Sequence, residues 1–458
     1  MQSEAWLLWA TLAAALLYHL TSAARSGGTG GRQPPGPTPL PVLGNLLDLG
    51  GNLHHTLARL ARAHGPVMKL KLGLVTTVVV SSRDAAREAY TRYDRHLAAR
   101  AVPDAANAVG NSGRSMIWLP SSDPLWKTLR GIVASHIFSP RGLAAARGVR
   151  ERKVRDMVGY FRRHAGEEVD VGQAVYGGVL NLRPLDLQGW RRWAGARYQK
   201  VFGILDGIID RRLADARTSK GEHAHGDFLD SLLELVSAGK IGRDKVTVIL
   251  FDVFAAGTDT MAITVEWAMA ELLRHPHAMA KVRAEMADIL GGKGTDTLEE
   301  PDAANLPYLQ AVVKEVMRLH PVAPLMLPHQ AAEDGVEIGG YAVPRGATVI
   351  FNVWAIMRDP AAWERPDEFV PERFLDKSAG VEFRGKDYEF LPFGSGRRLC
   401  PGLPMAERVV PFVLASLLHA FEWRLPDGVS ADEMDVTEKF TTVNTLAVPL
   451  RAVPVVVT

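Results

Sequence analysis

The chain of 458 residues is long enough for one large enzyme fold or for about two or three domains of average size. Its hydrophobic content of 47% and its 23% of charged residues are those of an ordinary globular protein. A formal net charge of +2 gives no general reason to expect nucleic acid as a partner, and a single cysteine argues against a disulfide-stapled secreted module.

The N-terminal residues 1–24 are predicted to be a membrane anchor. Ala5 to Ala24 is a run of twenty residues without a charged side chain, about the length that spans a bilayer as a helix. Arg25 and Arg32 follow it, so the positive-inside rule places the rest of the chain in the cytosol. A cleaved signal peptide is the alternative, but the first four residues lack a basic side chain. We therefore expect a permanent, single-pass anchor.

Residues 25–41 are predicted to be a hinge, flexible at Gly27–Gly31 and stiff at the proline-rich segment that ends at Pro41. Beyond it, in residues 42–458, helices are predicted at Leu53–Ala63, Lys153–Leu182, Trp190–Leu213, Arg243–Arg274, Tyr308–His320 and Gly402–Phe421. Strand pairs are predicted within 68–80 and within 338–350. Residues 101–120 have no period and are predicted to form a long loop.

The longest predicted helix, Arg243–Arg274, contains Ala-Gly-Thr-Asp-Thr at 256–260. A glycine inside a helix costs about 1 kcal/mol relative to alanine, and an acid between two threonines adds to that cost. One interpretation is a helix bend with a satisfied polar cluster. The other is proton delivery by Asp259 and Thr260, because a relay needs a hydroxyl at the reacting atom and a carboxylate linked to bulk water.

The single cysteine, Cys400, lies in the segment Phe-Gly-Ser-Gly-Arg-Arg-Leu-Cys-Pro-Gly at 393–402. Pro401 suits the first position of a helix, which would put Cys400 at the positive end of that helix and favour a thiolate, the form that binds metal. A buried structural cysteine is the alternative. The local framing by itself leaves both open.

Four motifs in this order resemble those of the cytochromes P-450. They are Trp126-x-x-x-Arg130, the Ala-Gly-Thr-Asp-Thr segment, Glu315-x-x-Arg318 followed by Pro-Glu-Arg-Phe at 371–374, and Phe393-x-x-Gly396-x-Arg398-x-Cys400-x-Gly402. The resemblance is greatest to the plant microsomal group that includes geraniol 8-hydroxylase and terpenoid hydroxylases. It implies a mainly α fold with a smaller β region, a single large catalytic domain at 42–458 on an N-terminal transmembrane helix.

The resemblance also implies roles for individual residues. Cys400 would be the axial thiolate ligand of the iron of heme b, in a heme-binding loop that includes Phe393 and Gly396. Asp259 and Thr260 would relay protons toward dioxygen. The heme propionates would be held by Trp126, Arg130, His329 and Arg398. Glu315, Arg318 and Arg373 would form a buried triad that fixes the loop before the cysteine.

The implied activity is a monooxygenase that inserts one oxygen atom of O₂ into a small apolar substrate, a terpenoid in this group. Electrons would come from NADPH through a membrane-bound NADPH–cytochrome reductase, at the endoplasmic reticulum membrane, with the catalytic domain in the cytosol. Residues expected to face the substrate are Ala255, Ala256, Val322–Leu325 and Asn444–Leu446. His329 stands where many plant members have arginine, which implies a weaker propionate contact.

Compared with plant members, the chain lacks about two helices between Leu182 and Pro184, a segment that the family uses as the roof of the substrate pocket. Two alternatives to a monooxygenase therefore stay open. One is a heme-thiolate isomerase or dehydratase that needs no reductase, against which the Asp259–Thr260 pair argues. The other is a non-catalytic or misfolded variant, because loss of a covering segment exposes apolar surface and admits water.

Overall fold

The structure is a computed structural model that describes residues 31–103, 106–107, 110, 112–177, 190–218, 227–291, 293–294, 298–375 and 380–457. These residues group into two compact units, each assembled from separate stretches of chain. Unit 1 comprises the residues up to Ala101, Ala323–Pro366 and Glu382–Leu399. Unit 2 comprises Val102–Val322, Asp367–Val381 and the residues from Cys400 onward. The predicted anchor, residues 1–24, and the predicted gap beside Arg183 lie outside the described residues.

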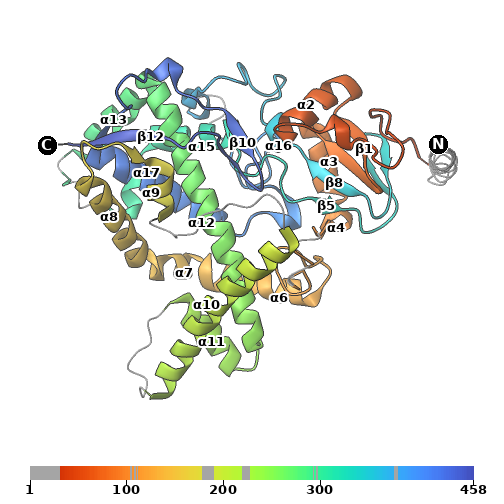
Figure 1. The fold of residues 1–458 in the computed structure, drawn as a ribbon, viewed down its shortest axis with the longest axis horizontal. Helices are drawn as coiled ribbons and strands as arrows, with labels where there is room; N and C mark the ends of the chain where they lie inside the picture. Colours follow the sequence, from red (N-terminus) through yellow and green to blue (C-terminus); the bar gives the residue numbers. More distant parts are fainter. Residues whose placement is uncertain are drawn as a thin grey trace, which may run out of the picture. The chain divides into compact units, whose positions relative to one another are not determined.

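Unit 1 holds the larger share of the β structure (Figure 1). Its helices are α2 (Leu53–His64), α3 (Arg83–Arg92), α4 (Asp94–Leu97) and α16 (Val353–Ile356). Its strands are β1 (Val67–Leu72), β2 (Val75–Val80), β3 (Ala99–Arg100), β5 (His329–Gln330), β6 (Val336–Ile338), β7 (Tyr341–Val343) and β8 (Thr348–Phe351).

Five of these strands form one sheet in the order β1-β2-β8-β5-β3, and only the β2–β8 pair is parallel. Met68 and Leu70 of β1 are buried and alternate with partly exposed lysines, as one covered sheet face requires. The β-branched run Val78–Val80 is fully buried in the adjoining strand. The strand pair predicted within 68–80 is therefore confirmed.

The two strands within 338–350 are predicted to pair with each other, and this prediction is wrong. β7 pairs with β6, whereas β8 lies between β2 and β5 in the large sheet. The pairing of Val349 with Val78 joins residues far apart in sequence, so the local pattern of residues 338–350 carries no signal for it.

Unit 2 is mainly helical. Its helices are α6 (Pro124–Ile132), α7 (Pro140–Ala145), α8 (Arg147–Arg163), α9 (Val171–Gly177), α10 (Trp190–Thr218), α11 (Phe228–Ser237), α12 (Arg243–Arg274), α13 (Pro276–Leu290), α14 (Glu300–Ala304), α15 (Pro307–Leu319) and α17 (Leu403–Ala420). Its strands are β4 (Val169–Asp170), β9 (Phe421–Arg424), β10 (Glu438–Phe440), β11 (Asn444–Leu446) and β12 (Arg451–Val456).

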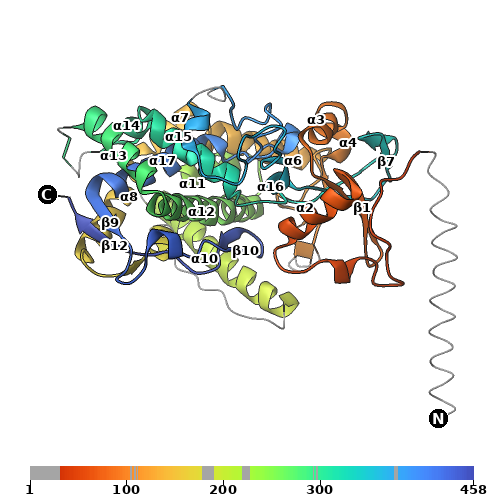
Figure 2. The same cartoon turned by 90° about the horizontal axis from the view of Figure 1, so that it is seen from above.

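The 32-residue helix α12 packs against α9, α10, α15 and α17, and Figure 2 shows it running among the helices of unit 2. Every residue from Ala262 to Leu273 is buried, so this half of the helix is a core element. Phe254, Ala255 and Ala256, in the middle of the helix, are exposed instead. Three apolar residues at the centre of α12 are thus left exposed.

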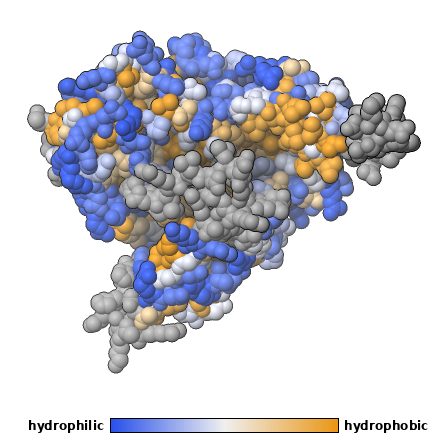
Figure 3. Space-filling view, in the orientation of Figure 1, coloured by the Kyte–Doolittle hydropathy of each residue, from blue (hydrophilic) through white to orange (hydrophobic). Residues whose placement is uncertain are grey.

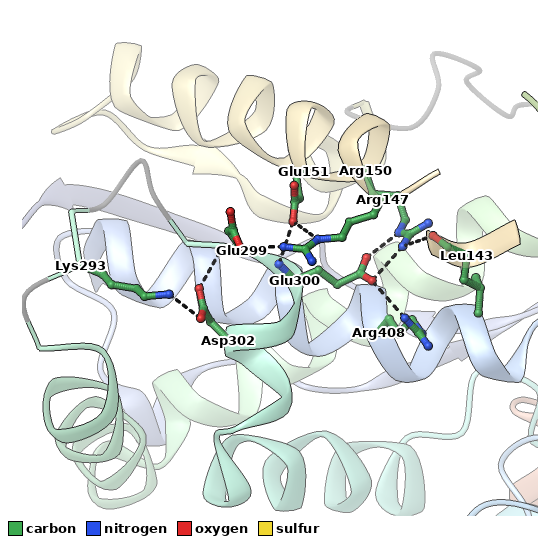
Figure 4. Close-up of polar contacts among 9 residues, drawn as sticks. All are labelled: Leu143, Arg147, Arg150, Glu151, Lys293, Glu299, Glu300, Asp302 and Arg408. Carbon is green, nitrogen blue, oxygen red and sulfur yellow. Dashed lines mark hydrogen bonds and ion pairs between the residues drawn. The ribbon is translucent and has the colours of Figure 1, made fainter. Parts of the chain in front are cut away.

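A network of ion pairs fastens α8 to α14 and α17 (Figure 4). Arg150 of α8 donates two hydrogen bonds, of 2.6 and 2.8 Å, to the buried carboxylate of Glu300. Arg408 of α17 lies 3.6 Å from the same carboxylate, and Arg147 bonds Glu299 at 2.7 Å. Two hydrogen bonds between one guanidinium and one carboxylate fix the relative orientation of the two groups and also compensate their charges.

The helix predicted at Lys153–Leu182 is two helices, α8 and α9, so that prediction is wrong. Between them the chain turns at Gly166, where φ is +84°, and forms the short strand β4. β4 pairs with β12, almost 300 residues away, and this distant partner interrupts the helix. The predicted helix Arg243–Arg274 is confirmed to the residue as α12.

Among the described residues, α12 and α17 are long and apolar enough to cross a membrane by length and composition. Two-thirds of the apolar window of α17 is buried inside the protein, as expected of a core helix.

Candidate functional site

Cys400 lies in the turn that leads into α17, where the backbone N–H groups of Gly402 and Leu403 donate hydrogen bonds to its sulfur. Burial raises the pKa of the Cys400 thiol, while those N–H groups and the charge of Arg130 favour the thiolate. The effect of burial is the largest of these. A bound metal cation would outweigh it, since a coordinating thiol is deprotonated outright.

Pro401, which the sequence predicts at the first position of this helix, lies two residues before the observed first residue. α17 begins at Leu403, with Gly402 as its N-cap residue, so Pro401 belongs to the turn. The two N–H groups that reach the sulfur still come from this end of the helix, as the sequence predicts.

Trp126 and Arg130 lie on α6. Asp123 is the N-cap residue of this helix, and its carboxylate accepts a hydrogen bond of 2.8 Å from the N–H of Leu125. The guanidinium carbon of Arg130 is 5.8 Å from the centroid of the Trp126 ring. Burial lowers the pKa of Arg130, and the neighbouring Cys400 opposes that shift. A largely buried cation therefore lies close to the cysteine within unit 2, where it suits an anionic ligand group.

Glu315, Arg318 and Arg373 are in contact within unit 2. The Glu315 carboxylate accepts hydrogen bonds from Nε of Arg318 at 2.7 Å and from Nε of Arg373 at 3.0 Å. It also accepts one from the N–H of Val370 at 2.9 Å. Glu315 and Arg318 are fully buried, so their charges must be compensated within the protein, and this contact and the partners above contribute to that compensation.

The remaining predicted heme contacts belong to unit 1, where Gly396 fixes the course of the loop before the cysteine. Its φ is +63°, and a Cβ there would lie 2.1 Å from Oδ1 of Asp94. The same oxygen accepts a hydrogen bond from the N–H of Arg397 at 2.9 Å, so only glycine allows the loop to dock on α4. The half-buried ring of Phe393 packs edge to face on Phe383, with centroids 5.4 Å apart.

Two arginines of unit 1 surround the buried His329. Arg398 donates from Nε to the carbonyl of Ala98 at 2.8 Å, and Arg100 of β3 is the register partner of His329 in β5. Burial, with Arg100 and Arg398 nearby, holds the pKa of His329 well below its usual range. Sequence reasoning missed Arg100, because strands of two residues leave no periodic signal.

One ring nitrogen of His329 already makes a hydrogen bond within unit 1. Its Nδ1 lies 2.8 Å from the carbonyl oxygen of Leu97, which requires a proton on Nδ1. The lowered pKa keeps the ring neutral, so Nε2 carries a lone pair and accepts hydrogen bonds. A propionate contact through His329 would need a second proton on this ring, whereas Arg100 and Arg398 carry permanent charge.

On α12, Thr260 donates from its hydroxyl to the carbonyl of Ala256 at 2.8 Å, one turn back. Burial raises the pKa of the half-buried Asp259 carboxyl, and the nearby hydroxyl of Tyr176 on α9 opposes that shift. A Cβ added to Gly257 would meet no atom within 4 Å, so open space adjoins the helix here. These residues lie beside the exposed apolar stretch 254–256.

Two further acids share a face of α12 with Asp259, at seven residues on either side. The buried carboxylate of Asp252 accepts hydrogen bonds of 2.8 Å from the hydroxyl of Ser115 and the N–H of Met116. Glu266 accepts one of 3.0 Å from the N–H of Leu450. The seven-residue spacing is visible in the sequence, but the partners come from distant segments and could not be predicted.

The residues Asn444–Leu446, which are expected to face the substrate, form strand β11 of unit 2. The N–H of Asn444 donates to the carbonyl of Val322 at 2.9 Å, and its carbonyl accepts from Nε1 of Trp267 at 3.3 Å. The strand that re-enters beside α12 is therefore held by backbone hydrogen bonds.

Each unit by itself holds groups of the kinds that bind a heme. Unit 2 has the Cys400 sulfur with two N–H donors and the partly buried Arg130 beside it. Unit 1 has two arginines around a neutral histidine. A sulfur ligand suits the iron of a porphyrin, and cationic groups suit its carboxylates.

A family model described as "Cytochrome P450" matches residues 34–183 and 177–448. The two matched segments meet and overlap at residues 177–183, where the sequence predicts a missing segment.

Rice proteins are similar to nearly the whole chain. "Cytochrome P450 76M5" of Oryza sativa subsp. japonica is 62% identical over 504 positions, covering 99% of both chains. "Ent-cassadiene C11-alpha-hydroxylase 1" of the same organism is 58% identical over 500 positions, with the same coverage. Since the first alignment has 504 positions and this chain 458 residues, at least 46 positions of that relative have no counterpart here. The predicted internal deletion near Leu182 agrees with this length difference and with the division of the family match, and it stays a prediction.

A solved structure titled "Zebra fish cytochrome P450 another structure with Progesterone" is similar with a TM-score of 0.75 and 25% sequence identity. The match covers 88% of this chain and 99% of that one. The predicted fold, mainly helical with a smaller β region, is confirmed.

Proposed function

The chain belongs to the cytochrome P450 family of heme monooxygenases, which use O₂, a redox partner and small hydrophobic substrates, and from this premise we propose that it hydroxylates a diterpenoid. The name of the 58% identical rice hydroxylase supports this substrate class. The observation that carries the proposal is the partly buried Cys400, with two N–H donors on its sulfur and Arg130 beside it.

Bound heme would supply the activation of dioxygen, and the residues of this chain would hold it and manage protons. Cys400 would ligate the iron, and the propionates would lie against Trp126, Arg130, Arg398 and Arg100, with the neutral His329 as a donor only once its ring gains a second proton. The reaction consumes O₂, two electrons and two protons, and yields the alcohol and water. Asp259 and Thr260 would pass those protons from solvent to the oxygen, and the Glu315 triad would fix the loop before the cysteine.

We place the protein on a membrane, with NADPH–cytochrome reductase as its electron donor. Turns 40–47 and 73–75 of unit 1 lie side by side, since the N–H of Gly73 bonds the carbonyl of Leu43 at 3.2 Å. They expose Leu47 and Leu74 at 72% and 78%. Figure 3 shows hydrophobic surface over the part of unit 1 that holds α2 and β1. Such a patch, in a chain that also carries the uncharged segment Ala5–Ala24, suits the surface of the endoplasmic reticulum.

The missing roof supports a second candidate, a heme protein without turnover. At least 46 positions are absent and Phe254–Ala256 of α12 are exposed, so water would reach the reacting centre. Electrons would then reduce oxygen without hydroxylating a substrate.

The experiment uses the full chain expressed with heme in membranes. We expect the carbon monoxide difference spectrum of a thiolate-ligated heme, and hydroxylation of a diterpene only with NADPH and reductase. A thiolate spectrum with NADPH consumption but no product supports the second candidate. Reductase-independent conversion identifies an isomerase or dehydratase. The Cys400→Ser variant is the control, and a thiolate spectrum from it would overturn the assignment of the ligand.

A further inference from the structure

We propose that Tyr90 of α3 is a positioning residue for the loop that leads to Cys400, because its ring and the thioether that its hydroxyl holds, that of Met326, lie against two glycines of that loop. The loop, residues 393–399, belongs to unit 1 together with both side chains. The inference rests on the proposed role of Cys400 as heme ligand for its functional consequence, whereas the contacts are a property of unit 1. None of the sequence motifs includes Tyr90 or Met326.

The loop meets these two side chains where its backbone takes left-handed conformations. The φ of Gly394 is +75° and that of Gly396 is +63°. A Cβ added to Gly396 would lie 3.2 Å from Cδ1 of Tyr90, and one added to Gly394 would lie 3.5 Å from Sδ of Met326. The phenol ring and the thioether therefore lie directly against the two points at which the loop turns.

Tyr90 is itself fixed by other elements of unit 1. Its ring is buried and stacks on Phe351 of β8, with centroids 4.6 Å apart and an interplanar angle of 22°. Its hydroxyl donates a hydrogen bond to Sδ of Met326 at 3.5 Å, and among the residues that the structure describes it makes no other. Burial raises the pKa of Tyr90 well above its usual range, so the phenol keeps its proton and donates it.

Met326 occupies a strained backbone position. Its φ is +51°, in the left-handed region that residues with a long side chain seldom adopt. Leucine at this position would carry the same backbone strain and nearly the same volume, but it has no acceptor atom. Met326→Leu would therefore leave the buried Tyr90 hydroxyl without a partner, and the ring would have to move away from Gly396 to reach water.

The first test measures the loop itself, by hydrogen exchange of the full-length heme protein followed by mass spectrometry over residues 391–399. We expect Met326→Leu to speed exchange in this segment by about tenfold, because the unpaired hydroxyl displaces the ring. Met68→Leu is the matched control, since Met68 is a fully buried methionine of β1 in the same unit, and it should leave exchange in the segment unchanged.

Rescue by a second substitution separates this proposal from general loosening of the fold. Tyr90→Phe removes the hydroxyl and with it the need for an acceptor, so by itself it should change exchange by less than about threefold. Combined with Met326→Leu, it should bring exchange back to that range, whereas two unrelated losses of packing would add. An unchanged rate in Met326→Leu, or a double variant no slower than Met326→Leu alone, would overturn the proposal.

The heme ligand supplies an independent readout. We expect the reduced carbon monoxide complex of Met326→Leu to lose its thiolate ligation about tenfold faster than the parent, and the double variant with Tyr90→Phe to restore the parent rate. Faster exchange of the loop with unaltered thiolate ligation would refute the positioning role and leave the contact intact. A parent protein without a thiolate signal would refute the proposed role of Cys400, and the functional consequence with it, while the exchange results still decide how the loop is held.

Discussion

Glu315 is a carboxylate without exposure to solvent that receives hydrogen bonds from two arginines and a backbone N–H. Two positive charges depend on it, since Arg318 is fully buried and the side chain of Arg373 is only 10% exposed. Removing the carboxylate takes away an anionic partner of both guanidiniums, which is more costly than the loss of an exposed ion pair.

We predict that Glu315→Ala lowers the free energy of unfolding by about 3–5 kcal/mol, as expected for breaking a buried ion pair. The measurement is denaturant unfolding, with heme content as a second readout. Asp156→Ala is the matched control, because Asp156 pairs with Lys153 at the same three-residue spacing but is 62% exposed. It should change stability by less than about 0.5 kcal/mol. Equal losses in both variants would contradict the structural role of the triad.

The burial of Asp252 should make the stability of the protein depend on pH. Burial raises its pKa from 3.8 to about 6, although Ser115 and the N–H of Met116 oppose the shift. Between these two values the folded protein binds a proton that the unfolded chain has released. The favourable contribution of the protonated acid is therefore complete below about pH 4 and is lost as the pH rises through about 6.

We predict that the stability of Asp252→Asn relative to the parent protein rises with pH between about 4 and 6, by up to about 3 kcal/mol. Asparagine keeps an acceptor oxygen for Ser115 and Met116 but does not ionise. The measurement is thermal or urea unfolding across that range. Asp156→Asn, in which an exposed acid is changed, should show no such slope. A flat difference for Asp252→Asn would mean that its carboxyl titrates normally.

At the scale of elements, α12 depends on three distant segments for the acids along one of its faces. Ser115 of the loop 112–120 bonds Asp252, the hydroxyl of Tyr176 on α9 lies near Asp259 and lowers the pKa that burial raises, and the N–H of Leu450 bonds Glu266. Each partner comes from a different stretch of chain. The seven-residue spacing of the acids therefore links one helix to a loop, a helix and the entry to β12.

The elements also show what could be predicted from the sequence. The helix α12 has a continuous apolar pattern, and the contact of Glu315 with Arg318 follows from their spacing on a helix. Both could therefore be predicted from the sequence. The division of 153–182 into α8 and α9 depends on the pairing of β4 with β12, and the proximity of Tyr176 to Asp259 depends on how α9 packs. Such long-range contacts have no local pattern and could not be predicted.

At the scale of the whole molecule, the main difference from the rice relative is in length. Compared with the 62% identical rice relative, at least 46 positions are missing, and the family match divides at residues 177–183. The cysteine turn, the triad and the relay residues all lie away from this point in sequence, and their contacts are formed. The deletion therefore bears on the cover of the substrate pocket and not on the cysteine turn.

We predict that inserting the missing segment of the rice relative at Leu182–Pro184 restores this cover. The exposed apolar stretch Phe254–Ala256 would be buried, so binding of a hydrophobic dye should fall and the melting temperature should rise by several degrees. With water excluded, product formed per NADPH should increase while hydrogen peroxide decreases. A Gly/Ser segment of equal length is the control, since it restores chain length without an apolar face. If both insertions behave alike, or if the parent chain already couples NADPH fully to product, the remaining helices close the pocket unaided.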